Sequence, residues 1–208
     1  MDTVPRYMKN FTLIAVLLWF TGALVAGWFG LFSEPDTPPT FLGIFFAAPI
    51  AVFKTLYLTS KDFRAFANGL DLSLIVGAHL WRYVGAGFIA AYLFGRLPAG
   101  FAIPEGLGDI IAAVFSLPLA IALRRSRPVR GYFIAWNIFG LLDLVSAITM
   151  GVLHSQGPLG VLRGEVSTAL MTTFPVNLIP TFFVPLFIML HALALARRNE
   201  VAKKASHG

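Results

Sequence analysis

Six long apolar runs, separated by short polar segments, dominate the pattern of this chain. They cover Phe11–Phe32, Thr40–Leu58, Leu70–Phe94, Gly108–Leu123, Gly131–Leu153 and Pro175–Ala196. A helix of about 20 apolar residues crosses the ~30 Å hydrocarbon core of a bilayer. The pattern therefore predicts an all-α, polytopic membrane protein, with residues 1–208 forming a single domain of six transmembrane helices.

Two of the connecting segments are predicted to be more than simple turns. Leu97–Leu107 is rich in proline and glycine, yet it is too apolar for a loop in water, so we expect it to dip back into the membrane. Ser155–Phe174 is the longest connection, and we expect a short interfacial helix over Val161–Met171. Regularly spaced prolines in the last run predict a bent helix there. They are Pro175, Pro180 and Pro185.

Composition supports the membrane class. Hydrophobic residues make up 57% of the chain and charged residues 12%, with a mean hydropathy of +0.77. A soluble domain has about twice that charged fraction, roughly 25%. The sequence contains no cysteine, which excludes disulfides, thiolate metal ligands and cysteine nucleophiles. No HExxH or comparable spacing of ligands is present either, so we expect no metal site.

The basic residues indicate an orientation. Twelve of the sixteen Lys and Arg residues fall in the ends and connections of one side, and two fall on the other. The larger set is Arg6, Lys9, Lys61, Arg64, Arg124, Arg125, Arg127, Arg130, Arg197, Arg198, Lys203 and Lys204, and the smaller is Arg96 and Arg163. This bias predicts cytoplasmic N- and C-termini, with residues 197–208 as a basic cytoplasmic tail. We expect an integral protein of a bacterial cytoplasmic (inner) membrane, with the bilayer and not nucleic acid as its partner.

Arg82 and Asp143 lie near the centres of two predicted spans. Each is twelve residues beyond the start of its run, at Leu70 and Gly131, so both are ~18 Å along a helix from the same membrane surface. A charge at this depth is costly and is seldom left without a partner or a role. Because the two charges are opposite and similarly deep, the sequence predicts that they can meet.

Other polar residues inside or beside the spans complete the candidate site. At ~100° per residue, Asp71 and His79 fall near the face of Arg82, and His154 shares a face with Asp143. If these faces meet, they form a polar line from Asp71 to His154. Asp109 is placed at a helix start, where we expect a cap. We expect interhelical hydrogen bonds from two asparagines. The candidates for binding or coupling are Arg82, Asp143, His79, Asp71, His154, Asp109, Asn137 and Asn177.

Several functions remain open on this evidence. The leading hypothesis is transport or permeation of a small solute or ion, with proton coupling: protonation of Asp143 releases Arg82, and His79 relays the proton inward. The first alternative is a redox subunit with b-type haem between His79 and His191. The second is a membrane scaffold or assembly factor. No nucleophile is evident for an enzyme. Small residues on the first span, from Gly22 to Gly27, favour close packing within the chain or in a homo-oligomer.

Overall fold

The structure is a computed structural model that describes residues 6–33 and 39–204, and these ranges contain helices and no strand. In chain order the elements are α1 (Arg6–Trp28), α2 (Thr40–Thr59), α3 (Lys61–Asn68), α4 (Leu72–Ala78), η1 (His79–Gly85), α5 (Ala86–Leu93), α6 (Ala99–Arg124), α7 (Arg130–Leu153), η2 (Thr168–Thr172), η3 (Ile179–Phe183), α8 (Val184–Ala196) and α9 (Arg198–Lys204). The labels η1 and η2 denote 3-10 helices, and η3 is a π-helical segment.

Six of the helical stretches in the described residues are long and apolar enough to cross a membrane, as the sequence predicts. They are Tyr7–Trp28, Thr40–Thr59, Leu72–Leu93, Ala99–Arg124, Arg130–Leu153 and Ile179–Ala196. The third stretch is one continuous rod made of α4, η1 and α5. Apart from the fourth, the observed boundaries differ from the predicted ones by at most five residues.

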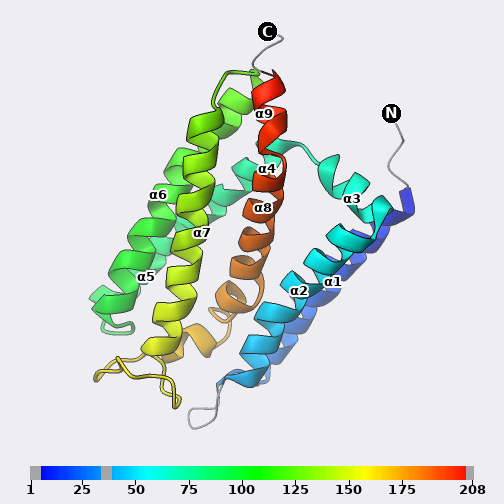
Figure 1. Cartoon of the computed structure of the whole chain (residues 1–208). Coiled ribbons are helices and arrows are strands. Elements are labelled where there is room, and N and C mark those ends of the chain that lie inside the picture. The colour runs from blue at the N-terminus through cyan, green and yellow to red at the C-terminus, as the bar shows by residue number, and fades with distance from the viewer. Residues whose placement is uncertain (1–5, 34–38, 205–208) are drawn as a thin grey trace.

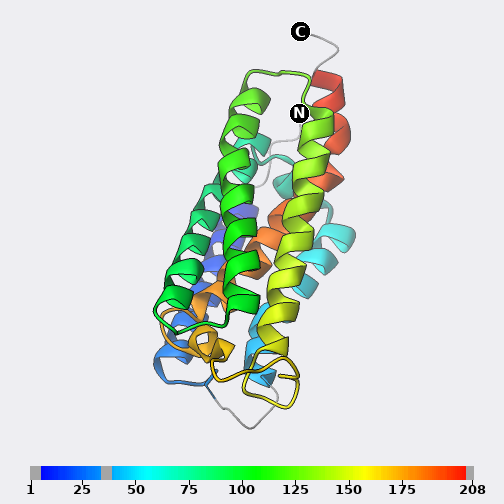
Figure 2. The same ribbon diagram turned by 90° about the vertical axis from the view of Figure 1, so that its left-hand side faces the viewer.

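The helices α6, α7 and α8 run side by side, whereas α1 and α2 are inclined to them (Figure 1). The helices α6 and α7 form a hairpin, and the α4–η1–α5 rod packs along α6. The helix α8 lies against α7 and α4, while α1 and α2 form a tilted pair whose contacts are with α3, η3 and α8. The start of α1 and the whole of α9 lie toward the same, upper end of the bundle (Figure 1), and Figure 2 shows α9 at that end from the side. We call this the terminal end and the opposite one the loop end.

The predicted re-entrant segment Leu97–Leu107 is wrong: from Ala99 onward it is the first part of α6. Pro98 is the N-cap residue of that helix. The aromatic ring of Phe101 and the methyl group of Ala102 pack in a buried cluster with Phe88. This burial holds the segment helical despite its prolines and glycines, so α6 begins nine residues before the predicted Gly108.

The segment before the last span also differs from the prediction. Residues Val161–Met171 do not form one interfacial helix; the backbone is irregular up to Ser167, and a short 3-10 helix begins at Thr168. The last helical stretch begins at Ile179 and not at Pro175, with a π-helical turn. In that turn the hydroxyl of Thr181 donates to the carbonyl oxygen of Asn177 (2.7 Å). The carbonyl oxygen of Thr181 accepts from the Trp19 indole (3.0 Å).

Buried apolar side chains gather at both ends of the bundle. At the terminal end a cluster that includes Val76, Leu119 and Phe133 joins α4, α6 and α7. At the loop end Phe88 and Phe101 pack with Leu97 and Met171. Charged residues of α6, α7 and η1 lie between these two clusters. The helix α2, by contrast, buries none of its residues against the described part of the chain.

The small residues of α1 pack within the chain. Ala23 and Ala26 are buried, and the side-chain amide of Asn177 donates to the carbonyl oxygen of Ala23 (3.1 Å). This is the interhelical hydrogen bond expected of Asn177. The close approach on this face of α1 is therefore to a neighbouring segment of the same chain, which accounts for the small residues without a second copy.

The first part of the predicted C-terminal tail is helical and packs against the bundle. Residues 198–204 form α9, and the Val201 side chain joins the buried cluster at the terminal end. The Arg197 guanidinium donates to the carbonyl oxygen of Leu70 (2.6 Å) and to the Glu200 carboxylate. The start of the tail is thus fixed to the connection before α4, while residues 205–208 lie outside the described ranges.

Paired substitutions on α6 test this packing. Leu119 is fully buried in the terminal-end cluster, whereas Leu117 on the same helix is 48% exposed. We expect Leu119→Ala to lower the free energy of unfolding by about 2–5 kcal/mol, because it leaves a cavity. Leu117→Ala is the matched control and should change it far less. Unfolding of both variants in detergent, followed by circular dichroism, measures this, and equal effects would contradict the placement of the core.

Candidate functional site

Arg82 lies at the middle of the bundle, on the 3-10 segment η1. A 3-10 helix has three residues per turn, so residues three apart lie directly above one another. His79, Arg82 and Gly85 are three apart, and these are the three buried residues of η1. The 3-10 winding thus points the histidine and the arginine in the same direction, toward α6, α7 and α8. In an α-helix, by contrast, residues three apart differ in direction by about 60°, so His79 and Arg82 would lie on nearly the same face and not directly above one another.

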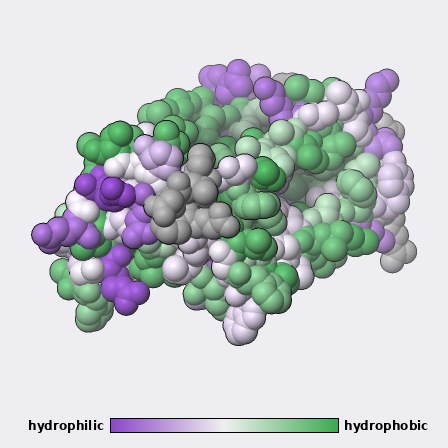
Figure 3. Space-filling view, turned by 90° about the horizontal axis from the view of Figure 1, so that it is seen from below, coloured by the Kyte–Doolittle hydropathy of each residue, from purple (hydrophilic) through white to green (hydrophobic). Residues whose placement is uncertain are grey.

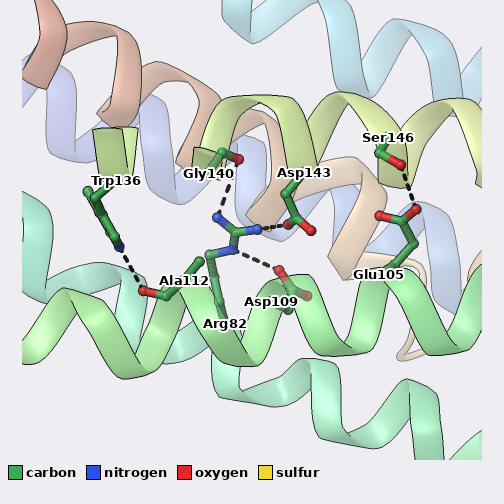
Figure 4. Close-up of polar contacts among 8 residues, drawn as sticks. All are labelled: Arg82, Glu105, Asp109, Ala112, Trp136, Gly140, Asp143 and Ser146. Carbon is green, nitrogen blue, oxygen red and sulfur yellow. Dashed lines mark hydrogen bonds and ion pairs between the residues drawn. The ribbon is translucent and has the colours of Figure 1, made fainter. Parts of the chain in front are cut away.

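The Arg82 guanidinium connects η1 to both helices of the α6–α7 hairpin (Figure 4). Its Nε donates to Oδ1 of Asp109 on α6 (2.7 Å), and its Nη2 pairs with the carboxylate of Asp143 on α7. Its Nη1 faces the carbonyl oxygen of Gly140 at 3.4 Å. Arg82 is 1% exposed. The two opposite charges noted in the sequence do meet, and a second carboxylate joins them.

Asp109 is not the helix cap that the sequence suggests. Because α6 begins at Ala99, Asp109 lies well inside the helix and not at its start. It is ten residues beyond Ala99, on the side of α6 that packs against η1, and there it pairs with Arg82. The expectation was wrong because it rested on the misplaced start of α6.

Glu105 is a third acidic residue in this region, and the sequence reasoning missed it. It is 1% exposed and one helical turn from Asp109 on the same face of α6. Its Oε1 accepts from the Ser146 hydroxyl of α7 (2.8 Å), while its Oε2 is buried without a hydrogen-bond partner among the described residues. A signal was present, since two acids four residues apart interrupt an otherwise apolar run.

The charges of this cluster do not balance. Asp143 interacts electrostatically with Arg82, Asp109 and Glu105. Within the described part of the chain, one guanidinium therefore lies near three carboxyl groups and contacts two of them. Uncompensated charge is very costly away from water. The cluster is close to neutral only when it also holds protons or a cation.

Two glycines allow this close packing of charged groups. A Cβ atom at Gly108 of α6 would overlap the carboxylate of Asp143. A Cβ atom at Gly140 of α7 would overlap the ring of His191 and come within 3.1 Å of Nη1 of Arg82. Glycine at these positions lets side chains of one helix lie directly against the backbone of the next.

His79 and His191 form a second buried group beside Arg82, on its terminal-end side. Their ring centroids are 4.0 Å apart, and Trp136 packs against both rings. The His191 Nδ1 donates to Oδ1 of Asn137 (2.9 Å), the interhelical hydrogen bond expected of Asn137. The His191 Nε2 and both nitrogens of His79 are buried without a hydrogen-bond partner among the described residues. Both imidazoles interact electrostatically with the Arg82 guanidinium.

The two imidazoles do not fit the haem hypothesis as they are placed. Axial histidines bind iron from opposite faces of the macrocycle, so the haem lies between their rings. Rings with centroids 4.0 Å apart are in direct contact and leave no space for it. No group of three or more His, Asp or Glu side chains in the described residues is arranged to hold a metal ion.

Asp71 and His154, the two ends of the predicted polar line, lie at helix termini, eleven residues along the chain from Arg82 and Asp143 respectively, and a joint role with the cluster stays a prediction. Asp71 is the N-cap of α4, where its carboxylate accepts from the backbone NH of Ser73 (2.8 Å). His154 is the C-cap residue of α7, and its Nδ1 lies 2.9 Å from the carbonyl oxygen of Met150. Asn177, on the segment before η3, contacts α1. Each of these three side chains forms a hydrogen bond with a backbone group.

A cavity reaches from the loop end to Asp109. It has a volume of about 120 Å³ and is lined by α5, α6, α7, η2 and η3, with Asp109 as the one charged residue among the described residues that line it. A second cavity of about 50 Å³ shares Asp109 and Leu144 with it and is also lined by Arg82. Figure 3 views the loop end, where hydrophobic residues cover much of the face and hydrophilic ones lie mainly toward its margins.

Comparison with known proteins identifies a family. A family model described as a domain of unknown function (DUF8737) matches residues 39–197. This range includes all the residues of the charged cluster and both buried histidines. No curated protein and no solved structure matches the chain.

A pair of glycine substitutions tests the packing of the site. In Gly140→Ala the new methyl group overlaps the His191 ring, so we expect a loss of about 1–3 kcal/mol in unfolding free energy from overpacking. Gly87→Ala is the control, because nothing described lies within 4 Å of its added Cβ. It should stabilise the helix by about 0.5–1 kcal/mol. Thermal unfolding in detergent compares the two, and an unchanged stability in Gly140→Ala would contradict the described contact.

Proposed function

This chain belongs to the DUF8737 family, and we propose that it spans a lipid bilayer and transports a small solute or ion with coupling to protons. Its six apolar helices are the membrane spans, and the cluster around Arg82 is the site that binds and couples. The cavity at the loop end is the route by which the solute reaches this cluster.

The observation that supports this proposal most is the uneven charge balance at the end of the cavity. Two carboxyl groups pair with one guanidinium midway along the bundle, and a third, that of Glu105, lies one helical turn from Asp109. A salt bridge with a purely structural role needs only equal numbers of opposite charges. A site with surplus carboxyl groups instead exchanges protons or cations with whatever enters it, which is a common role of ionisable residues inside membranes.

The proton route proposed for the transport cycle uses the groups next to Arg82. When Asp143 takes up a proton, its attraction to the guanidinium weakens, and Arg82 keeps Asp109 as its remaining anionic partner. The unpartnered nitrogens of His79 and His191 lie between Arg82 and the terminal end, where they can accept and release a proton in turn. Proton movement and solute movement are coupled because both change the charge at Arg82.

The proposed orientation has the terminal end in the cytoplasm. Connections at that end contain Lys61, Arg64, Arg124, Arg125, Arg127 and Arg130, whereas Arg96 and Arg163 belong to the loop end. Short basic connections remain on the cytoplasmic side of a membrane. The cavity then opens on the outer side.

Labelling of single cysteines tests this orientation. The chain has no native cysteine, so each variant reports one position. We expect Gln156→Cys, exposed at the loop end, to react with a membrane-impermeant maleimide in intact cells. Ser126→Cys, exposed at the terminal end, should react after the cells are lysed and not before. The reverse pattern would place the terminal end outside.

Transport itself is tested in proteoliposomes that contain a pH-sensitive dye. A panel of small ammonium compounds, carboxylates and neutral solutes is added outside, with protein-free liposomes as the baseline. We expect at least one class to change the internal pH, and Asp143→Asn to lower that rate by at least about tenfold, because its side chain no longer exchanges a proton. Glu165→Gln, an acidic residue exposed at the loop end, is the matched control and should retain the rate.

The scaffold alternative is favoured by one observation, the complete burial of Arg82 between two other helices. The same assay separates it from transport. A folded wild-type protein that moves no solute of the panel and no protons, or an Asp143→Asn variant with the wild-type rate, would reject the transport proposal and leave the cluster as a structural link between η1, α6 and α7.

A further inference from the structure

We infer that the cavity at the loop end binds a small hydrophobic organic cation, with an ammonium group at Asp109 and an apolar body toward the loop end. This names the substrate class of the site, and it rests on the transport function proposed above. The lining of the cavity, its size and the surplus of carboxyl groups around Asp109 all favour such a ligand.

The lining is complementary to such a molecule. The side chains around the cavity are mostly apolar and include Phe88, Phe101, Leu144 and Ile148, while the charged group among the described lining residues is the Asp109 carboxylate. Arg82 lines the smaller inner cavity and not this one. A bound ligand therefore contacts apolar side chains along its body and the Asp109 carboxylate at one end. The carboxylate favours a ligand with a positive charge at that end.

The surplus carboxyl groups provide the second, independent observation. Glu105 is 1% exposed, and its Oε2 has no hydrogen-bond partner in the described structure. Figure 4 shows this carboxylate on the side of the cluster that also holds Asp109 and Asp143. A buried polar atom is normally partnered. A proton on Glu105, or a cation beside the cluster, supplies what is missing.

The size of the cavity limits the body of the ligand. Its volume of about 120 Å³ is comparable to apolar cavities of about 150 Å³ that hold one benzene molecule. A single aromatic ring or a short branched alkyl group fills such a space. Benzylammonium, which combines one ring with one ammonium group, is therefore a suitable probe.

Binding of the cation should release a proton. The charged groups at the site are Arg82 from η1, Glu105 and Asp109 from α6 and Asp143 from α7, with the His79 ring of η1 and the His191 ring of α8 beside Arg82. One guanidinium balances one of the three carboxylates, so the other two hold protons in the empty site. An ammonium group replaces one of these protons, and no bond other than the O–H bond of the carboxyl group is broken.

Calorimetry on the detergent-solubilised protein at pH 7 tests the inference. Benzylammonium is titrated in two buffers with different ionisation enthalpies, so the difference between the measured heats gives the number of protons released. We expect saturable binding with release of about one proton per cation, from charge balance. Benzoate and benzyl alcohol, the anionic and neutral counterparts, should each bind at least about tenfold more weakly.

Two variants locate the binding. Asp109→Asn should weaken benzylammonium binding by at least about tenfold, because it removes the carboxylate at the cavity. Ala147→Leu, on the cavity wall of α7, leaves every charge in place and fills the space for the ring, so it should also weaken binding even if Asp109→Asn fails to fold. Glu165→Gln is the control and should bind as the wild type does.

Each outcome decides one proposal. Tighter binding of benzoate, equal binding of benzyl alcohol, or no saturable binding by folded protein would overturn the assignment of an organic cation. Movement of another solute in proteoliposomes would then still support transport. Binding of benzylammonium as described, with no flux of any solute, would support the site and reject transport.

Discussion

The structure depends on the neutralisation of one buried guanidinium. Arg82 reaches the middle of the bundle, and removing a charge from water is tolerated only with close, well-placed partners. The partners are supplied by α6 and α7, through Asp109 and Asp143. The rod that contains Arg82 is thereby tied to both helices of the hairpin, at a level between the two apolar clusters. The same interaction fixes the fold and brings the surplus acids together.

The backbone around this interaction is adapted to it. Gly108 and Gly140 have no side chain, so carboxylate, imidazole and guanidinium groups lie against helix backbone. Trp136, one turn from Gly140, donates to the carbonyl oxygen of Ala112 (2.9 Å) and also covers both imidazoles. The hairpin is thus held by hydrogen bonds on either side of the charges. These hydrogen bonds keep the three acids close together on α6 and α7.

The sequence predicted the helical class, the number of long apolar helices and the meeting of Arg82 with Asp143. These follow from apolar length and from depth along a helix, which depend little on tertiary packing. It did not predict the start of α6, because proline and glycine in that segment suggest a loop until the packing of Phe101 is known. Glu105 and the pairing of Asp109 were missed for the same reason. His79 and His191 were placed at similar depth, but the direct contact of their rings depends on packing.

The 3-10 segment within the third long rod has a geometric consequence. A 3-10 helix rises about 2.0 Å per residue and an α-helix 1.5 Å, so rewinding the seven residues of η1 as α-helix would shorten the rod by about 3.5 Å. The same change would rotate Arg82 away from His79 by about 60°, since three residues no longer complete a turn. Winding of η1 therefore links the length of the rod to the direction in which its one buried charge points. A local change of helix type, without any hinge between domains, is sufficient to move that charge along and around the axis of the bundle.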